Sequence, residues 1–475
     1  MKVLRSATTV LKGTDGKVLK VRPDEYIEPS ATNFQFEVSV DAGQVFTMPT
    51  INSFLYLPYG GVNNASSGIL VYDYTVDWGD GSAIPTITAY NSASRIHTFV
   101  NAGKYIITIS STTKKFPSFD CSDNGYTAIR PLITRIISWG DVGLKKFNLY
   151  GCTALITLPE QPQKLTSLLT LTNFCYGCLS LTSIPYGTFF KTGTDNMVVG
   201  DASYAFYNCS KLLSIHSTTF RDCTGITYFI SVFQGCNKIT YVSGDLFANC
   251  TLAIYFNYAF YLCTLLDNLP SNLFQNNTAL NSNFYGVFQS TGVTSVPAGL
   301  FNNVRSTSFQ YCFYGCASLT TIPEYLFLGQ NLCISFSYAF GACSKLTNVP
   351  TGVFDISVGG VNACTDMQSC FISCGTASNV TTFTIANNLF DHLYKVTNFY
   401  GTFNGCTKFA GIPSGLFVNC VAATNFAYTF ASNKHSSIPP DLFDSCTEVV
   451  EFSGTFYGNY SLTSVGIPED LFRYC

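Results

Sequence analysis

Cysteine thiols are the side chains of this chain with the widest range of possible chemistry, because thiolates attack electrophiles, bind metals and form disulfides. The chain has 20 of them in 475 residues. Equivalent positions of a repeat array lie on top of one another, at a strand-like spacing of about 4.8 Å. We therefore expect a structural ladder of buried thiols that act as small apolar residues with a weak donor. Fourteen cysteines share the repeating position: Cys152, Cys178, Cys209, Cys223, Cys236, Cys250, Cys263, Cys316, Cys343, Cys374, Cys406, Cys420, Cys446 and Cys475.

Disulfides are the main alternative for these thiols. A bonded framework is typical of small, cysteine-rich secreted domains. Here Asn277 and Asn459 take the repeating position in two repeats, and a disulfide partner would not easily tolerate that replacement. Free thiols are therefore favoured over a bonded framework.

Six cysteines lie off the ladder: Cys121, Cys175, Cys312, Cys333, Cys364 and Cys370. Two of them, Cys175 and Cys312, precede a ladder cysteine at a spacing that suits a metal site. No His or second Cys pair stands nearby to complete four ligands, which disfavours structural zinc. Whether the off-ladder thiols form disulfides stays open.

Candidate catalytic side chains are few. The four histidines, His97, His216, His392 and His435, lie in different modules or repeats, and none stands beside Ser or Cys in a nucleophile motif. The chain has no G-x-S-x-G motif, no phosphate-binding loop and no H-E-x-x-H motif. We therefore expect a protein that is not an enzyme, without catalytic, cofactor-binding or metal-binding residues.

The thiols are positioned by a sequence repeat of about 27 residues that runs from Phe147 to the last residue. Each repeat consists of an aromatic residue, two residues, Cys, two residues, and Leu or Ile. A second half-unit with a similar sequence pattern follows. Segments such as LTSIP at 181–185 fit a short strand that proline ends. Repeats of this kind bury their apolar faces only by stacking, so the sequence predicts an all-β-leaning solenoid.

The repeats share the motif F-x-x-C-x-x-L-x-x-I-P, as in Phe313-x-x-Cys316-x-x-Leu319-x-x-Ile322-Pro323. This motif resembles the BspA-like leucine-rich repeats of bacterial and phage surface proteins. The resemblance covers residues 147–475 and implies a leucine-rich-repeat solenoid. Repeats near 340 to 403 are longer than the others, which predicts inserted loops at 355–380. Such loops are natural places for specific contacts, and whether they bind anything stays open.

Composition limits the possible partners. Charged residues make up only 11% of the chain, the net charge is −3, and no run of Lys and Arg stands out, which disfavours nucleic acid. No stretch approaches the roughly 18 to 20 apolar residues of a membrane helix.

Arg5, Lys12 and Asp15 interrupt what would be the apolar part of a signal peptide. We expect either a mature chain or export by another route, such as release within a virion.

A second resemblance lies before the repeats, where short alternating runs separated by Gly and Asn predict a small antiparallel sandwich. The segment VDWGDGS at 76–82 is followed by HTF at 97–99 and by GKYIITI at 103–109. This order resembles the PKD-type immunoglobulin-like domain, and the resemblance implies a spacer or adhesive module. Asp77 and Asp80 are a weak candidate for Ca²⁺, because no further oxygen ligands accompany them.

These features predict four regions along the chain. The expected order is an N-terminal arm or attachment segment at 1–34, a PKD-like β-sandwich at 35–113, a linker and solenoid N-terminal cap at 114–146, and the BspA-like solenoid at 147–475.

Tyrosine recurs two residues before the repeated Phe, at Tyr204, Tyr258, Tyr338 and Tyr428. A solvent-facing column of these rings would be a platform for sugars or protein, because Tyr offers a flat apolar area with a polar tip. Alternate residues of a strand point to the same side, and each tyrosine stands two residues before an inward-facing Phe. This spacing favours a place in the core instead. A binding surface at these four residues is therefore the alternative interpretation.

The large, weakly charged repeat surface favours a non-enzymatic, surface-displayed binding or adhesion protein. The first hypothesis is a phage virion fibre or decoration protein on the virion surface or outside the cell, attached through its arm. Alternatives are a secreted BspA-like adhesin on the bacterial cell surface and a purely structural virion component. Expected partners are a protein or glycan on a cell surface, a virion or surface anchor, and further copies through the uncapped end at 471–475. The ligand, the host and the number of copies stay open.

Overall fold

The computed structural model describes residues 11–12, 18–19, 32–54, 68–159, 165, 167–186, 189, 200–355 and 362–475. Helices in these ranges are four 3-10 helices of three residues each: η1 (Ala93–Arg95), η2 (Asn124–Tyr126), η3 (Arg130–Leu132) and η4 (Ser464–Gly466). The expectation of an all-β-leaning chain is confirmed.

Two predicted regions lie partly or mostly outside the described residues. The arm at 1–34 is described at its last residues and at two short antiparallel strands, β1 (Leu11–Lys12) and β2 (Val18–Leu19). The inserted loops at 355–380 are described except for 356–361. No helix within the described ranges is long and apolar enough to cross a membrane.

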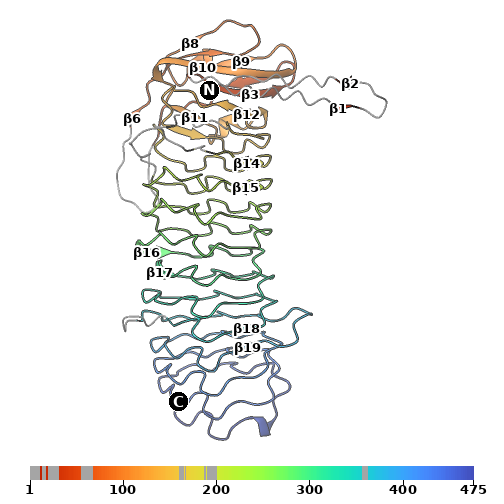
Figure 1. Cartoon of the computed structure of the whole chain (residues 1–475), viewed down its shortest axis with the longest axis vertical. Helices are drawn as coiled ribbons and strands as arrows, with labels where there is room; N and C mark the ends of the chain where they lie inside the picture. Colours follow the sequence, from red (N-terminus) through yellow and green to blue (C-terminus); the bar gives the residue numbers. More distant parts are fainter. Residues whose placement is uncertain are drawn as a thin grey trace.

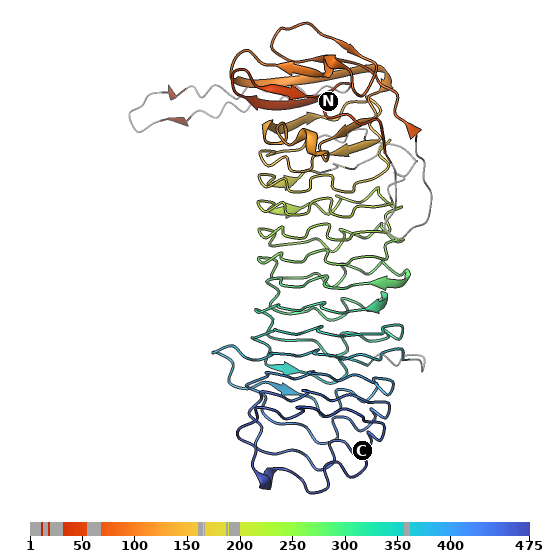
Figure 2. The ribbon, with the colours of Figure 1, turned by 180° about the vertical axis from the view of Figure 1, so that it is seen from behind.

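The molecule is elongated, with a β-sheet at one end and a long stack of coils that leads away from it (Figure 1). The view from behind shows the same succession of coils down to the C-terminus (Figure 2). Neighbouring coils run parallel, because residues about one repeat apart form parallel bridges, as between Tyr228 and Tyr255. One continuous hydrophobic cluster includes both the sheet and the stack.

The N-terminal sheet is antiparallel and has the strand order β12-β3-β10-β7-β8. Its strands are β3 (Phe34–Val40), β7 (Asp73–Asp77), β8 (Thr86–Ile87), β10 (Gly103–Lys115) and β12 (Ile133–Ser138). Two further antiparallel pairs lie beside it: β4 (Val45–Thr47) with β9 (Ile96–Thr98), and β5 (Ser53–Phe54) with β6 (Gly68–Ile69). Alternating buried side chains of β3 and β7 face the core, as expected for a sheet with one covered face.

The segment expected to link sheet and repeats takes part in both. Strand β12 pairs with β3 in the sheet, and the N–H of Ile136 in β12 donates to the carbonyl of Thr157 at 3.1 Å. Strand β11 (Ser118–Asp120) pairs in parallel with β13 (Lys146–Asn148). Trp139 is fully buried against Phe147, with ring centroids 5.0 Å apart. The apolar end of the stack is therefore covered by the sheet, and the boundaries at 113 and 146 stay predictions.

Short parallel strands join some successive coils. The pairs are β14 (Ser183–Ile184) with β15 (Ser214–Ile215), β16 (Leu280–Asn283) with β17 (Arg305–Ser308), and β18 (Asn348–Val349) with β19 (Thr384–Ile385). Elsewhere the coils consist of turns and single bridges, so hydrogen bonding between coils does not depend on long strands.

Backbone hydrogen bonds tie each coil to the next. The N–H of Phe229 donates to the carbonyl of Tyr255 at 2.8 Å, and that of Phe233 donates to Ala259 at 2.9 Å. N–H groups between these positions close turns within the coil, as from Val232 to the carbonyl of Phe229 at 3.3 Å. Alternate N–H groups of this segment thus have a partner only because another coil lies beside it.

Left-handed backbone conformations make this hydrogen bonding possible. Tyr258 and Leu262 flank the inward Phe260 and have φ of +57° and +62°. In the next coil the same positions hold Gly286 and Ser290, at +58° and +54°. With this backbone every second N–H group of the segment, those of Tyr258, Phe260 and Leu262, donates to a carbonyl of the next coil.

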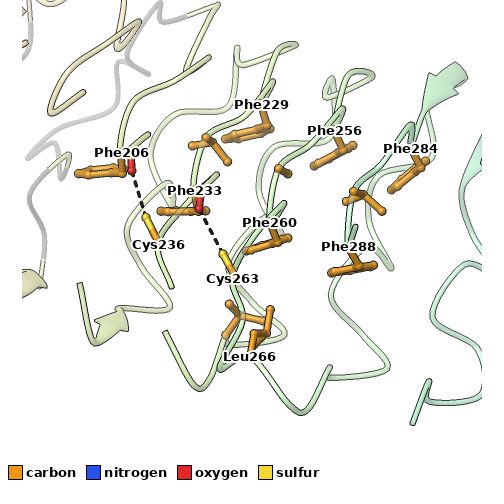
Figure 3. Close-up of a cluster of buried hydrophobic side chains, with 14 of the residues drawn as sticks. Phe206, Phe229, Phe233, Cys236, Phe256, Phe260, Cys263, Leu266, Phe284 and Phe288 are labelled. Carbon is orange, nitrogen blue, oxygen red and sulfur yellow. Dashed lines mark hydrogen bonds between the residues drawn. The ribbon is translucent and has the colours of Figure 1, made fainter. Parts of the chain in front are cut away.

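Columns of phenylalanine rings fill the interior of the stack (Figure 3). In one column, Phe206, Phe233, Phe260 and Phe288 follow one another with ring centroids 5.7, 5.7 and 5.6 Å apart. A second column contains Phe229, Phe256 and Phe284, and a third contains Phe220, Phe247 and Phe274. All of these rings are fully buried, so each coil covers the apolar face of its neighbour.

Removal of one ring from the first column should destabilise the stack. Phe260→Ala leaves a cavity between Phe233 and Phe288, so we expect the free energy of unfolding in urea to fall by about 3–5 kcal/mol. Leu265→Ala is the matched control, because Leu265 is 46% exposed in the same coil, and it should change the value by about 0.5 kcal/mol or less. Equal losses in the two variants would contradict the assignment of the ring column to the core.

Candidate functional site: thiol columns and a tyrosine face

The fourteen predicted ladder cysteines form two columns, because each coil contributes two half-units with separate rows of Phe. Cys263 Sγ donates to the carbonyl of Phe233 at 3.2 Å in the first column (Figure 3). Cys250 Sγ lies 3.6 Å from the carbonyl of Phe220 in the second. The first column contains Cys152, Cys178, Cys209, Cys236, Cys263, Cys316, Cys343, Cys374 and Cys406. The second contains Cys223, Cys250, Cys420, Cys446 and Cys475. The single column expected from the sequence is corrected in this respect.

Amide side chains take over the thiol's hydrogen bond in three coils. The bonds run from Asn277 Nδ2 to the carbonyl of Cys250 at 2.8 Å, from Gln330 Nε2 to that of Phe301 at 2.8 Å, and from Asn459 Nδ2 to that of Phe430 at 2.7 Å. The carbonyl of the preceding coil accepts in each case. This position therefore selects a short buried donor, which explains why Asn can replace Cys there.

The thiols are free and chemically protected. All 20 are unpaired, and only Cys475 is exposed, so the six off-ladder cysteines are buried as well. Burial raises the pKa of Cys250 to about 12 and that of Cys316 to about 11. Protonated, buried thiols are poor nucleophiles, so these columns support the fold and do not form a reactive site.

The carboxylates of the turn at 76–82 bond to groups of the protein itself. Asp77 Oδ1 accepts from the N–H of Gly79 at 2.9 Å, and Asp80 Oδ2 lies 2.7 Å from His97 Nε2. Trp78 is buried and stacks on the His97 ring at 4.9 Å. A Cβ on Gly79 would lie 2.5 Å from the carbonyl oxygen of Ile106, which explains the glycine. No group of three His, Cys, Asp or Glu able to hold a metal ion occurs in the described part of the chain.

His435 is the one deeply buried histidine among the described residues. Its ring lies between Phe409 and Phe430, at centroid distances of 5.0 and 5.9 Å, and its Nδ1 has no hydrogen-bond partner there. Burial lowers the pKa of His435 to about 4. The imidazole is therefore neutral at physiological pH and acts as a core residue.

The coils near His435 should lose stability in acid. Because the unfolded chain takes up the proton near pH 6.5 and the folded chain only near pH 4, stability falls as the pH drops between these values. The loss should reach about 3 kcal/mol at pH 4. We expect His435→Gln to remove this part of the difference in unfolding free energy between pH 7 and pH 4. His216→Gln, at an exposed histidine, is the control, and an equal effect of both variants would contradict the assignment.

The four predicted tyrosines lie at the surface and not in the core. Tyr204, Tyr258 and Tyr338 are half-buried, and Tyr428 is 37% exposed. The core interpretation failed because the period-2 rule holds for extended strands, whereas these tyrosines have φ between +56° and +59°. Their recurrence does produce an aromatic column, as in the parallel rings of Tyr311 and Tyr338 at 4.7 Å.

These tyrosines belong to a continuous outer surface that we call the tyrosine face. It consists of the six-residue segments around the inward Phe of ten successive coils: 203–208, 230–235, 257–262, 285–290, 310–315, 337–342, 368–373, 400–405, 427–432 and 453–458. None of these segments contains Asp, Glu, Lys, Arg or His. Burial and then the neighbouring Tyr258 hydroxyl raise the pKa of Tyr285 to about 12, so its phenol is neutral as well. The tyrosine face is therefore long and uncharged.

Small residues in one coil make room for tyrosine rings of the preceding coil. A Cβ on Gly286 would lie 2.7 Å from Cδ1 and Cε1 of Tyr258, and one on Gly454 would lie 2.7 Å from Cε1 of Tyr428. Each ring thus occupies the space that the next coil's side chain would fill. The rings lie along the surface of the stack, where they are held by backbone beneath them.

A shallow hollow interrupts the tyrosine face at its second to fourth segments. Gln234, Tyr258, Tyr261 and Gln289 line this hollow, whose volume is about 140 Å³. Neither Gln side chain makes a hydrogen bond to another described residue, so both amides are available to a ligand. Sequence reasoning missed Gln234 and Gln289, although the lack of charged residues in these segments can be read from the sequence.

Comparison with known proteins gives no family for this chain: it matches no protein-family model and no curated protein. The likeness to BspA-like repeats and to PKD-type domains therefore rests on the motif residues themselves.

Proposed function

We propose that this chain is a non-enzymatic binding protein displayed on a surface. In this proposal the coils are a leucine-rich-repeat solenoid of the BspA-like kind, and the N-terminal sheet is a PKD-like β-sandwich that serves as a spacer. The tyrosine face is the recognition surface. The preferred setting is a phage fibre or decoration protein, with a bacterial surface adhesin as the alternative.

The observation that carries the proposal is the uncharged, tyrosine-rich face along ten coils. Tyr, Ser, Gly and Asn are also the residues that antibody binding loops favour, because Tyr provides large rigid contacts and the others provide adaptable hydrogen bonds. Several of these tyrosines stand in left-handed backbone, where glycine would avoid a cost of about 1–2 kcal/mol each.

Rigidity supports the same function. Backbone hydrogen bonds and ring columns fix each segment of the tyrosine face between two neighbours, as at Phe233 and Phe260. A preorganised surface loses little conformational entropy on binding, so more of the contact energy appears as affinity. The buried, protonated thiols support a role without covalent chemistry.

Surface display can be tested by immunogold electron microscopy with an antibody against residues 200–355. We expect gold on purified virions from the organism that encodes the chain, because the proposal places the stack on the particle exterior. Gold on the envelope of intact bacteria would select the adhesin alternative. Gold confined to the cytosol in thin sections would contradict display, and virions from a strain without this gene are the control.

A further inference from the structure

The hollow in the tyrosine face suits one class of ligand. We propose that Gln234, Tyr258, Tyr261 and Gln289 form a subsite for an uncharged pyranose ring of a glycan chain that runs along the tyrosine face. This inference rests on the proposed binding function and specifies the ligand of the same surface.

Charge is the first argument for a neutral sugar. All four residues that line the hollow are uncharged, and the six-residue segments of the coils on either side also lack charged residues. An ionised ligand group would lose hydration here without gaining a counter-charge. Lys238 stands outside the segment 230–235, so an acidic ligand would have to contact the margin of the face and not the hollow.

The chemical groups of the hollow match those of a pyranose. One side of such a ring presents C–H groups, which pack on the flat apolar surface of Tyr, and its rim carries hydroxyl groups. Gln234 and Gln289 each offer one amide acceptor and two donors for those hydroxyls. The phenol groups of Tyr258 and Tyr261 add polar tips beside the same space. A volume of about 140 Å³ suits a small group such as one sugar ring.

The backbone at Tyr258 permits a choice of side chain at the surface. Tyr258 has φ of +57°, a conformation that glycine adopts without steric cost, and Gly286 occupies the equivalent position of the next coil at +58°. The fold therefore accepts glycine at this position. Leu262, Ser290 and Tyr325 are left-handed as well, so this conformation belongs to the coil, and the position of Tyr258 is free to carry a ring for surface contacts.

Recurrence along the stack suits a polymeric ligand. Tyr428 lies over Gly454 in the same way as Tyr258 lies over Gly286. Successive coils are close together, as shown by the 5.7 and 5.6 Å spacings of the Phe column beneath the face. A glycan chain can therefore contact several coils at once, and linked weak contacts raise the overall affinity.

The experiment is a glycan array followed by titration calorimetry with the purified full-length chain. The probes are neutral β-1,4-glucan, α-1,4-glucan, β-1,4-mannan and chitin oligosaccharides, together with sialylated and uronic acid oligosaccharides. We expect binding to at least one neutral probe, with an affinity that is unchanged when the salt concentration is raised. Binding to acidic probes alone, strong weakening by salt, or no binding to any probe would overturn the inference.

Variants test whether the ligand binds in the hollow. Tyr258→Gly suits the left-handed backbone and should weaken the neutral glycan at least tenfold without loss of the folded circular dichroism spectrum. Gln289→Ala should weaken it severalfold, and it tests the hollow if Tyr258→Gly does not fold. Tyr241→Ala is the matched control, because Tyr241 is 58% exposed outside the tyrosine face, and it should leave the affinity unchanged. Unchanged affinity in folded Tyr258→Gly and in Gln289→Ala would overturn the inference.

The two proposals fail separately. A chain found only in the cytosol that still binds neutral glycans through Tyr258 would overturn display alone. A displayed chain whose variants at the hollow bind no differently from wild type would overturn the glycan subsite alone.

Discussion

Each coil of this protein is incomplete until the next coil lies beside it. The N–H of Phe233 finds its acceptor on Ala259 of the following coil, and the Phe260 ring stacks on Phe288 of the next one. An unpaired buried N–H and an uncovered aromatic ring are both costly in water. Stability is therefore shared between neighbours, and long strands or helices are not needed to hold the stack together.

The same constraint determines which residues can vary. Positions that face the interior accept Phe, Leu or a short donor, so Cys, Asn or Gln can each satisfy the carbonyl of the preceding coil. The left-handed position of Tyr258 lies at the surface and holds glycine in the next coil, at Gly286, so the choice of side chain there is left to the outer surface. A rigid interior thus carries a variable exterior, which is the arrangement that recognition along a surface requires.

Much of this arrangement could be predicted from the sequence. The repeat of Phe, Cys and Leu indicates a buried, stacked interior. The presence of Asn277 at a repeating cysteine position indicates free thiols. The sequence did not predict two thiol columns, because the half-units look alike and only their packing separates them. The tyrosines were assigned to the core because period-2 reasoning assumes extended backbone, and left-handed residues other than glycine leave no clear signal. The place of β12 in the sheet depends on pairing with β3, about 100 residues earlier in the chain.

Hydrogen exchange of the native protein, followed by mass spectrometry, tests the dependence between coils most directly. If each coil is completed by the next, amides that donate to a following coil, such as those of Phe229, Phe233 and Phe260, should be strongly protected throughout the stack. Amides of exposed residues such as Leu252 and Leu265 should exchange quickly. Strong protection confined to the N-terminal sheet, with rapid exchange at all amides of the coils, would contradict this account.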